Sequence, residues 1–281
     1  MDHVSAAADH YTALQRFYER LTGGLSIHLP LWMPGTRTLD QATLNAVTCM
    51  ANTCNVRQGH YVLDAGCGLG GTAFWLANAC GARVLGVSNS NSNIQRCREL
   101  AAARDPGRLT EFQTADLMAS PFADDTFDFV WNLESINYLC PKQSYIQNVF
   151  RILRPGGIWV SMDRYSDLSS ANGSADSGII ASLTSGFYTP QHWEGVPALL
   201  KYMQQGGFAE TSYRDLTPYV LGSPPNRRVG GPRIALSVLA GLRSPRSCVA
   251  LFRAYRVIRA SFFLMEHGAM TYGLIKGVKP T

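Results

Sequence analysis

The chain has 281 residues, of which 46% are hydrophobic, and its formal net charge is +5 at neutral pH. This length fits one large domain, or one domain with a cap, and is short for two full domains. The mild positive charge is weak support for a nucleic-acid-binding protein unless the basic residues cluster.

The cysteines, the N-terminus and the longest apolar runs of the chain indicate its cellular location. The seven cysteines are scattered and lack zinc-ligand spacing, which indicates a reduced, cytoplasmic protein. Residues 1–11 have neither the basic region nor the apolar region of a signal peptide. No apolar run reaches the about 18 residues that a spanning helix needs, so no stable membrane insertion is expected.

The first 54 residues are expected to form a helical lid. Apolar residues recur at three- and four-residue steps from 9 to 22, which predicts a helix. A loop follows, and a second helix is predicted over about 39–54.

From residue 60 the pattern changes to strands that alternate with helices. The expected strands cover residues 60–65, 83–88, 108–114, 126–133 and 157–163, with helices at 71–80, 89–104 and 142–153. This alternation predicts an α/β fold: a Rossmann-like, seven-stranded, mostly parallel sheet with helices on both faces. Residues 55–165 are expected to form its ligand-binding core.

The last segment, 166–281, is expected to complete the core and to carry a helical cap. Residues 164–186 are rich in small residues and predict a loop or lid, and strands are predicted at 206–217 and 269–278. A substrate cap inserted at about 217–266 would contain a strong helix over 246–266. Its apolar stripe is Leu251, Tyr255, Ile258, Phe262 and Met265, and Arg253, Arg256 and Arg259 fall outside that stripe.

The segment VLDAGCGLGG, residues 62–71, places four glycines after a buried strand. Gly66, Gly68 and Gly71 satisfy the spacing of a dinucleotide-binding loop. However, Asp64 stands where a pyrophosphate would sit, and a carboxylate opposes an anion. It suits a cationic ligand, such as the sulfonium and ammonium groups of S-adenosylmethionine. The second strand also ends in GVSNSNS, without an acid for ribose hydroxyls.

Two further segments follow the glycine loop in a characteristic order. QTADLMASPFADDTFDFVWNLESINYL and RILRPGGIWV, read together with the glycine loop, resemble the class I S-adenosylmethionine-dependent methyltransferases over residues 55 to about 165. LDAGCGLGG, GVSNSNSNIQRCRELA and WNLESINYL are similar to the group of tocopherol, sterol and prenyl-diphosphate C-methyltransferases and cyclopropane synthases. SIHLPLW matches that group's His-x-x-x-Trp segment.

This resemblance implies a set of cofactor-binding residues. They are Asp64, Gly66, Gly68, Gly70, Ser88, Asn89, Asn93, Asp116, Leu117, Asn132 and Tyr18. At Asn93 the group usually has a glutamine, so the shorter amide weakens the expected ribose contact.

The same resemblance, with the aromatic and basic residues of the caps, suggests the reaction. We expect C-methylation of an apolar isoprenoid, with Glu134 and His28 as catalytic residues. The expected substrate-binding residues are Trp32, Tyr138, Trp193, Arg227, Arg228 and Tyr255. Arginines of the cap would hold a prenyl diphosphate, which would bring its own Mg²⁺, although no protein metal site is visible.

Other readings stay open at this point. An O- or N-methyltransferase of an aromatic or alkaloid metabolite shares every motif up to residue 165. A nucleic-acid methyltransferase is disfavoured because NLES stands where a Pro-Pro-aromatic element is needed. A cofactor-binding protein without catalysis is the non-enzymatic alternative. The expected partner is a small-molecule substrate rather than nucleic acid, and a homo-oligomer is left open. Arg253, Arg256 and Arg259 would suit either a phosphate or a membrane surface.

Overall fold

The computed structural model describes residues 25–26, 28–105, 107–119, 121–166, 193–222 and 245–281. The chain divides into two compact units. One consists of residues 1–46, 165–195 and 216–272, which we call the cap unit; the other consists of 47–164, 196–215 and 273–281, which we call the sheet unit. The helix predicted at 9–22 and most of the lid predicted at 164–186 lie outside the described residues.

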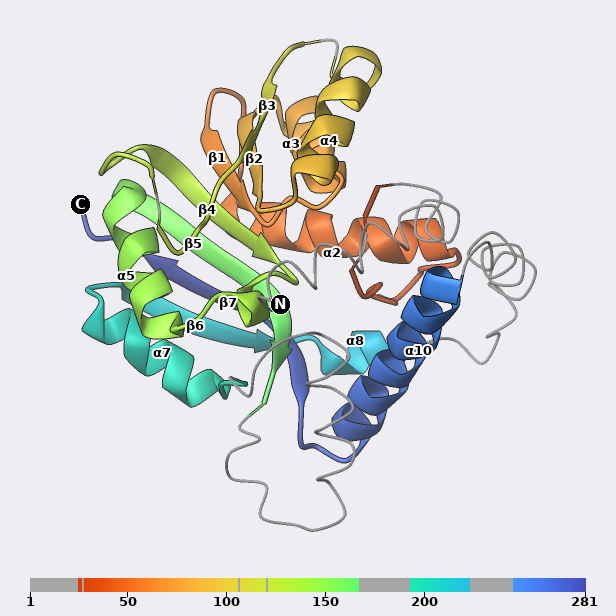
Figure 1. The fold of residues 1–281 in the computed structure, drawn as a ribbon. Helices are drawn as coiled ribbons and strands as arrows, with labels where there is room; N and C mark the ends of the chain where they lie inside the picture. The colour runs from red at the N-terminus through yellow and green to blue at the C-terminus, as the bar shows by residue number, and fades with distance from the viewer. Residues whose placement is uncertain (1–24, 27, 106, 120, 167–192, 223–244) are drawn as a thin grey trace. The chain divides into compact units, whose positions relative to one another are not determined.

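A seven-stranded sheet in the order β3-β2-β1-β4-β5-β7-β6 confirms the predicted fold class (Figure 1). β1 pairs in parallel with β2 and β4, β2 with β3, and β4 with β5, whereas β6 is antiparallel to β7. The strands are β1 Tyr61–Ala65, β2 Arg83–Ser88, β3 Thr110–Thr114, β4 Phe127–Leu133, β5 Leu153–Tyr165, β6 Ala209–Asp215 and β7 Thr271–Val278.

The central strands are continuous apolar runs because both faces of the sheet are covered. In β1 only the first residue is more than 9% exposed, and in β2 only Arg83 is exposed. Trp131 of β4 and Trp159 of β5 are completely buried and are among the largest core side chains. Burial on both faces fixes the register, and so fixes where each strand ends.

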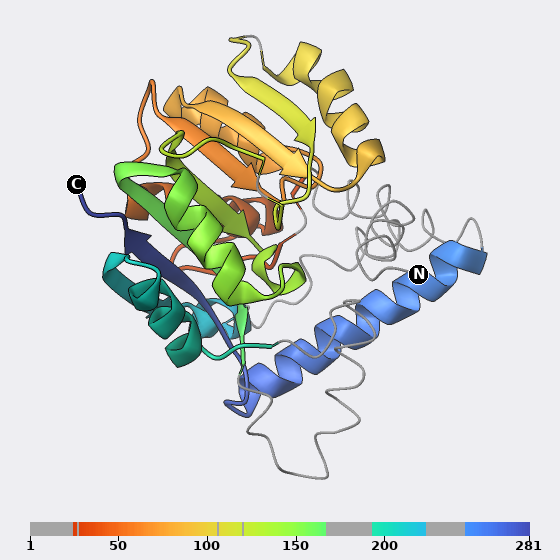
Figure 2. The same ribbon diagram turned by 60° about the vertical axis from the view of Figure 1, so that its left-hand side comes forward.

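Four helices of the sheet unit connect these strands: α3 Gly71–Cys80, α4 Asn91–Arg104, α5 Lys142–Ile152 and α7 Val196–Gln205. α5 and α7 lie side by side in both views (Figures 1 and 2). The predicted helix at 39–54 is confirmed as α2 Leu39–Cys54, which runs from one unit into the other. The short helix α7 was not predicted.

The segment RPGG, residues 154–157, lies just after α5, which ends at Ile152 and so confirms the helix end predicted near residue 153. It lies inside β5, where the register against β4 shifts between Phe127 and Phe129. Gly156 has φ of 77°, a conformation that glycine adopts without a Cβ penalty. The segment is therefore an irregularity of the strand rather than its start.

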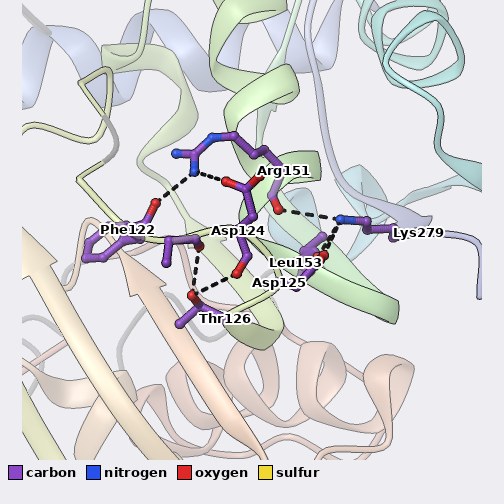
Figure 3. Close-up of polar contacts among 8 residues, drawn as sticks. Phe122, Asp124, Asp125, Thr126, Arg151, Leu153 and Lys279 are labelled. Carbon is purple, nitrogen blue, oxygen red and sulfur yellow. Dashed lines mark hydrogen bonds and ion pairs between the residues drawn. The ribbon is translucent and has the colours of Figure 1, made fainter.

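Lys279 fastens the C-terminal end of the chain to the start of β5 (Figure 3). Its Nζ donates to the carbonyl oxygens of Leu153 at 2.7 Å and Arg151 at 3.4 Å, and pairs with Asp125 at 2.7 Å. Lys279 is only 14% exposed at its side chain, so these carbonyl contacts satisfy a largely buried ammonium.

The described part of the cap unit is built around two helices, α8 Thr217–Leu221 and α10 Pro245–Glu266. The loop before α2 contacts α8, since the N–H of Trp32 donates to the carbonyl oxygen of Tyr219 at 2.8 Å. The helix predicted at 246–266 is confirmed, but its buried residues are Ala254, Val257, Ala260, Ser261, Leu264 and Met265. Of the expected apolar stripe, Met265 is buried, whereas Tyr255 and Ile258 are exposed. None of the described helices is long and apolar enough to cross a bilayer.

Candidate functional site

The glycine loop links β1 to the N-terminus of α3. Gly66, Gly68 and Gly70 have φ of 99°, 53° and 79°, which side-chain-bearing residues rarely adopt. A Cβ at Gly66 would clash with the side chain of Ser135, whereas one at Gly68 would meet open space. The loop therefore presents bare backbone to an approaching ligand, beside the unpaired N–H groups of a helix start.

Asp64 lies at the carboxyl end of β1, directly before this loop. Its side chain is 2% exposed, and its Oδ2 has no hydrogen-bond partner in the described part of the chain. Burial raises the pKa of Asp64 to about 7, although the N–H of Ala73 in α3 favours the charged form. A buried carboxyl with an unused oxygen lacks a donor or a cation. The residues present therefore fit the positively charged ligand predicted from the sequence.

The carboxyl end of β2 lies next to this loop, since Ala65 pairs with Val87. Ser88 is buried, and its Oγ accepts the N–H of Ser90 at 3.2 Å. Ser90 in turn caps α4 by accepting the N–H of Asn93 at 3.3 Å. Asn93 is buried and Asn89 is exposed. These contacts hold the start of α4 at the same sheet edge as Asp64.

Asp116 and Leu117 follow β3, whose last residue Thr114 pairs with Ser88. Asp116 is exposed, and its Oδ1 accepts the N–H of Met118 at 2.8 Å, which fixes a tight turn. Leu117 is half-buried. The expected cofactor residues of three neighbouring strands thus meet at one edge of the sheet, where open α/β sheets bind ligands.

Asn132 requires a correction, because its hydrogen-bonding capacity is used inside the core. Its Nδ2 donates to the Ala65 carbonyl at 3.1 Å and to Ser135 Oγ at 2.9 Å. Its Oδ1 accepts from Tyr145 at 2.8 Å and from Trp159 at 2.8 Å. An amide has two donors and two acceptor positions, so none is left for a cofactor. Asn132 instead ties the end of β4 to the end of β1.

A buried cluster of charged residues, which we call the acid cluster, occupies the carboxyl ends of β4 and β5. Glu134 accepts from Arg164 Nη2 at 2.8 Å, and both side chains are 9% exposed. Asp163 accepts from Asn137 Nδ2 at 2.9 Å and from the Arg164 N–H at 2.8 Å, all on Oδ1. Its Oδ2 is buried and has no partner in the described residues.

The protonated and charged forms of the Asp163 carboxyl group are close in free energy near neutral pH. Burial raises the pKa of Asp163 to about 7, the Arg164 guanidinium favours its charged form, and Glu134 and Lys142 act in opposite directions. Glu134 itself has φ of 51°, so its backbone is held in a conformation that is uncommon for a non-glycine residue. The acid cluster can take up a proton near neutral pH, a property that general bases share.

Sequence reasoning found Glu134 but missed Asp163, Asn137 and Arg164. The available signal was a carboxylate at the end of the fifth predicted strand, because the ends of neighbouring parallel strands meet at one edge. The pairing of β4 with β5 brings Leu133 opposite Met162 and so joins these residues.

The remaining expected site residues are not assembled by the described contacts. Tyr138 is half-buried in the short helix Ile136–Tyr138, in the sheet unit. His28, Trp32, Trp193 and Tyr255 belong to the cap unit, where Trp193 is buried and Tyr255 exposed. The His28 ring Nδ1 lies 3.2 Å from the Leu29 carbonyl. Tyr18, Arg227 and Arg228 lie outside the described residues. Within the described ranges, no group of three or more His, Cys, Asp or Glu side chains could hold a metal ion.

Comparison with known proteins agrees with this geometry. Residues 62–157 match the family model described as "Methyltransferase domain". The 27-O-demethylrifamycin SV methyltransferase of Amycolatopsis mediterranei is 29% identical over 209 residues, 74% of this chain and 75% of that protein. The sterol 24-C-methyltransferase of Yarrowia lipolytica is 28% identical over 59% of this chain but only 44% of its own length.

The fold also matches solved structures. The geranyl diphosphate C-methyltransferase of Streptomyces coelicolor superposes with a TM-score of 0.75 at 16% identity, over 99% of this chain and 98% of that one. Residues 62–157, with the glycine loop and this strand order, therefore form a methyltransferase domain of the S-adenosylmethionine-dependent type.

Proposed function

We propose that this methyltransferase acts on a hydroxyl oxygen of an apolar natural product. The observation that carries this choice is the extent of similarity: the relative aligned over about three quarters of both chains is named for an O-demethylated rifamycin. The sterol C-methyltransferase aligns over less than half of its own length.

The reaction has simple chemical requirements. When bound, S-adenosylmethionine supplies an electrophilic methyl group. The oxygen–carbon bond forms as the carbon–sulfur bond breaks, and the acceptor hydroxyl loses its proton. The protein must therefore hold the acceptor oxygen in line, keep water out and receive one proton.

In this proposal the glycine loop and the acid cluster, which both lie at the carboxyl ends of parallel strands, have different functions. Asp64 and the glycine loop hold the cationic cofactor, with Ser88, Asn93, Asp116 and Leu117 beside them. The acid cluster receives the proton. Glu134 is already bonded to Arg164 at 2.8 Å, whereas Asp163 has an unused carboxyl oxygen. We therefore assign the proton to Asp163, with Glu134 and Arg164 orienting it.

Aromatic and imidazole side chains are proposed to bind the acceptor, because aromatic side chains bury apolar ligands well. The proposed residues are His28, Trp32, Tyr138, Trp193 and Tyr255. Arg227 and Arg228 enter this proposal only if the acceptor carries a phosphate.

C-methylation of an isoprenoid is the second candidate. The motif pattern of residues 62–138 and the sterol methyltransferase relative favour it. Loss of a proton from a carbocation also needs a base, so the acid cluster serves both reactions. An isoprenoid diphosphate acceptor would require Mg²⁺, whereas a hydroxylated acceptor would not.

Incubation with a carbon-13-labelled methyl donor separates the candidates. We would screen hydroxylated macrolides, quinols, sterols and prenyl diphosphates, with and without Mg²⁺, and read the labelled methyl by NMR. A methoxy signal supports the proposal. A methyl group on carbon would replace it with the second candidate, and an N-methyl signal would reject both.

A further inference from the structure

Positive charge is concentrated in one segment of this chain. Residues 216–265 contain eight arginines and no aspartate or glutamate, whereas the rest of the chain has 17 Lys and Arg against 20 Asp and Glu. The net charge of +5 is therefore the sum of a strongly basic segment, residues 216–265, and a slightly acidic remainder of the chain.

Exposed apolar side chains are concentrated on α10, within the same segment. The described residues include six large hydrophobic side chains that are exposed, and five of them belong to this helix. They are Val249, Phe252, Tyr255, Ile258 and Phe263, with exposures of 53%, 62%, 57%, 44% and 40%. Exposed large apolar side chains that gather on one element mark a surface that contacts a partner or a membrane.

The exposed aromatic and basic residues share one side of α10. Phe252, Arg256, Arg259 and Phe263 follow one another at steps of four, three and four residues, which places them on one face. Arg256 lies over the Phe252 ring at 5.9 Å, and Arg259 Nη1 is 3.5 Å from the Tyr255 hydroxyl. The opposite face is buried and consists largely of small residues.

We propose that this face of α10 binds the surface of an anionic lipid bilayer. Phenylalanine rings would enter the boundary between head groups and acyl chains, while the guanidinium groups stay at the level of the lipid phosphates. The helix would lie in the plane of the surface, since no described helix can span the bilayer. The charge of the segment complements that of the lipids.

Two other occupants explain the face less well. In a self-association of two copies, the arginine-rich faces would meet each other, and like charges in contact oppose binding. A polynucleotide would pair with the arginines but would leave Phe252, Ile258 and Phe263 exposed to water. Both occupants are outcomes of the test below.

The test measures binding of the full chain to vesicles by flotation. Vesicles of phosphatidylcholine alone are compared with vesicles that also contain phosphatidylglycerol, at low and high salt. We expect tight binding only to the anionic vesicles, and weaker binding as salt rises. Equal binding to both vesicles, or none to either, overturns the proposal.

Two double variants then separate the apolar and basic contributions. The Arg256→Gln/Arg259→Gln variant should bind about thirtyfold more weakly, because each basic residue near an anionic surface contributes roughly fivefold. The Phe252→Ser/Phe263→Ser variant should lose at least about tenfold, since each ring buries apolar surface on binding. Unchanged binding of either variant overturns the proposal.

Matched controls show whether location on α10 matters. Leu44 is exposed to 45% outside α10, and Arg104 and Lys201 are exposed basic residues of α4 and α7. Leu44→Ser and Arg104→Gln/Lys201→Gln should bind like the original chain, and a comparable loss of vesicle binding in them overturns the proposal.

Light scattering measures whether each protein is a monomer or a dimer. If the original chain is a dimer and the Phe252→Ser/Phe263→Ser variant is a monomer, the face is assigned to self-association instead. Duplex DNA is also tested as a competitor of vesicle binding. Competition that is lost in Arg256→Gln/Arg259→Gln but kept in Phe252→Ser/Phe263→Ser would also overturn the proposal.

Discussion

Protonation of Asp64 should control cofactor affinity. Burial raises the pKa of this carboxyl to about 7, and its Oδ2 has no partner among the described residues. S-adenosylhomocysteine keeps its ammonium charge over the range pH 5.5–8.5, and we expect it to bind the ionised form of Asp64. Its affinity should then rise with pH up to neutrality and become constant above it.

The size of the effect follows from this pKa. With a pKa of about 7, about 3% of Asp64 is ionised at pH 5.5, so binding there should be roughly thirtyfold weaker than at pH 8.5. That ratio corresponds to about 2 kcal/mol. Binding at pH 6 should release nearly one proton per cofactor, because most of the carboxyl is protonated before the ligand arrives.

Isothermal titration calorimetry measures both quantities. Affinity is obtained at each pH, and the proton count comes from buffers with different ionisation enthalpies. Asp64→Asn should bind weakly and with little dependence on pH, close to the original chain at pH 5.5. Asp163→Asn is the matched control, since Asp163 is equally buried with a pKa raised to about the same value, but lies outside the glycine loop.

Two results would refute this reasoning. The first is an affinity that changes less than about threefold between pH 5.5 and pH 8.5 in the original chain, since the calculated change is about thirtyfold. The second is a pH dependence that persists in Asp64→Asn but disappears in Asp163→Asn. Either would mean that the charge of Asp64 is not what the cofactor recognises.

Three further predictions concern stability, measured by urea unfolding. The folded-state pKa of Asp163, about 7, lies above its unfolded value, so its contribution is present below about pH 4 and lost as pH rises to 7. In the original chain this contribution lowers the free energy of unfolding by about 1.4 kcal/mol per pH unit between pH 5 and 6.5. Asp163→Asn should remove this slope, and an unchanged slope contradicts the prediction. Gly66→Ala should cost at least about 1–3 kcal/mol more than Gly59→Ala, since both have positive φ but only Gly66 lacks space for a Cβ; equal losses would argue against the clash. Lys279→Met should cost about 1–3 kcal/mol by removing the hydrogen bond to the Leu153 carbonyl and the ion pair with Asp125, whereas exposed Lys201→Met should cost less than about 0.5 kcal/mol. Similar values would show that the contacts of Lys279 contribute little.

Much of the sheet could be predicted because its signals are local. A buried strand of an α/β sheet is a short apolar run, and the glycine loop after β1 marks both a strand end and a helix start. By contrast, the strand predicted to begin at residue 157 begins at Leu153, because pairing with β4 keeps the RPGG segment in β5.

The site was predicted less completely because its contacts join distant parts of the chain. Asn132 has the residue type and position of a ligand-binding side chain, but Tyr145 and Trp159 occupy its oxygen. Neither contact has a sequence signal. Asp163 joins the acid cluster only because β5 pairs with β4 and Asn137 reaches it across 26 residues of sequence.

The buried face of helix α10 was also predicted incompletely from the sequence. Periodicity selected the large apolar residues of α10 as one stripe, but the buried face combines Ala254, Val257 and Ala260 with Leu264 and Met265, while Tyr255 and Ile258 of the stripe are exposed. Small residues allow a helix to approach its neighbours closely, and this contact rather than side-chain size decided the orientation. Packing within the described part of the chain therefore does not explain the large apolar residues on the exposed side of α10.

The acid cluster also matches the proton balance of the proposed reaction. Methylation of a hydroxyl releases one proton, and the site must accept it without a large cost. With Arg164 paired to Glu134, ionised Asp163 is the remaining negative charge among these three residues; Arg164 and Lys142 favour its charged form, whereas burial favours its protonated form. A buried neutral cluster is favoured over a charged one, so burial itself drives the uptake. An asparagine at 163 would keep the cluster neutral from the start and could receive no proton, whatever the acceptor.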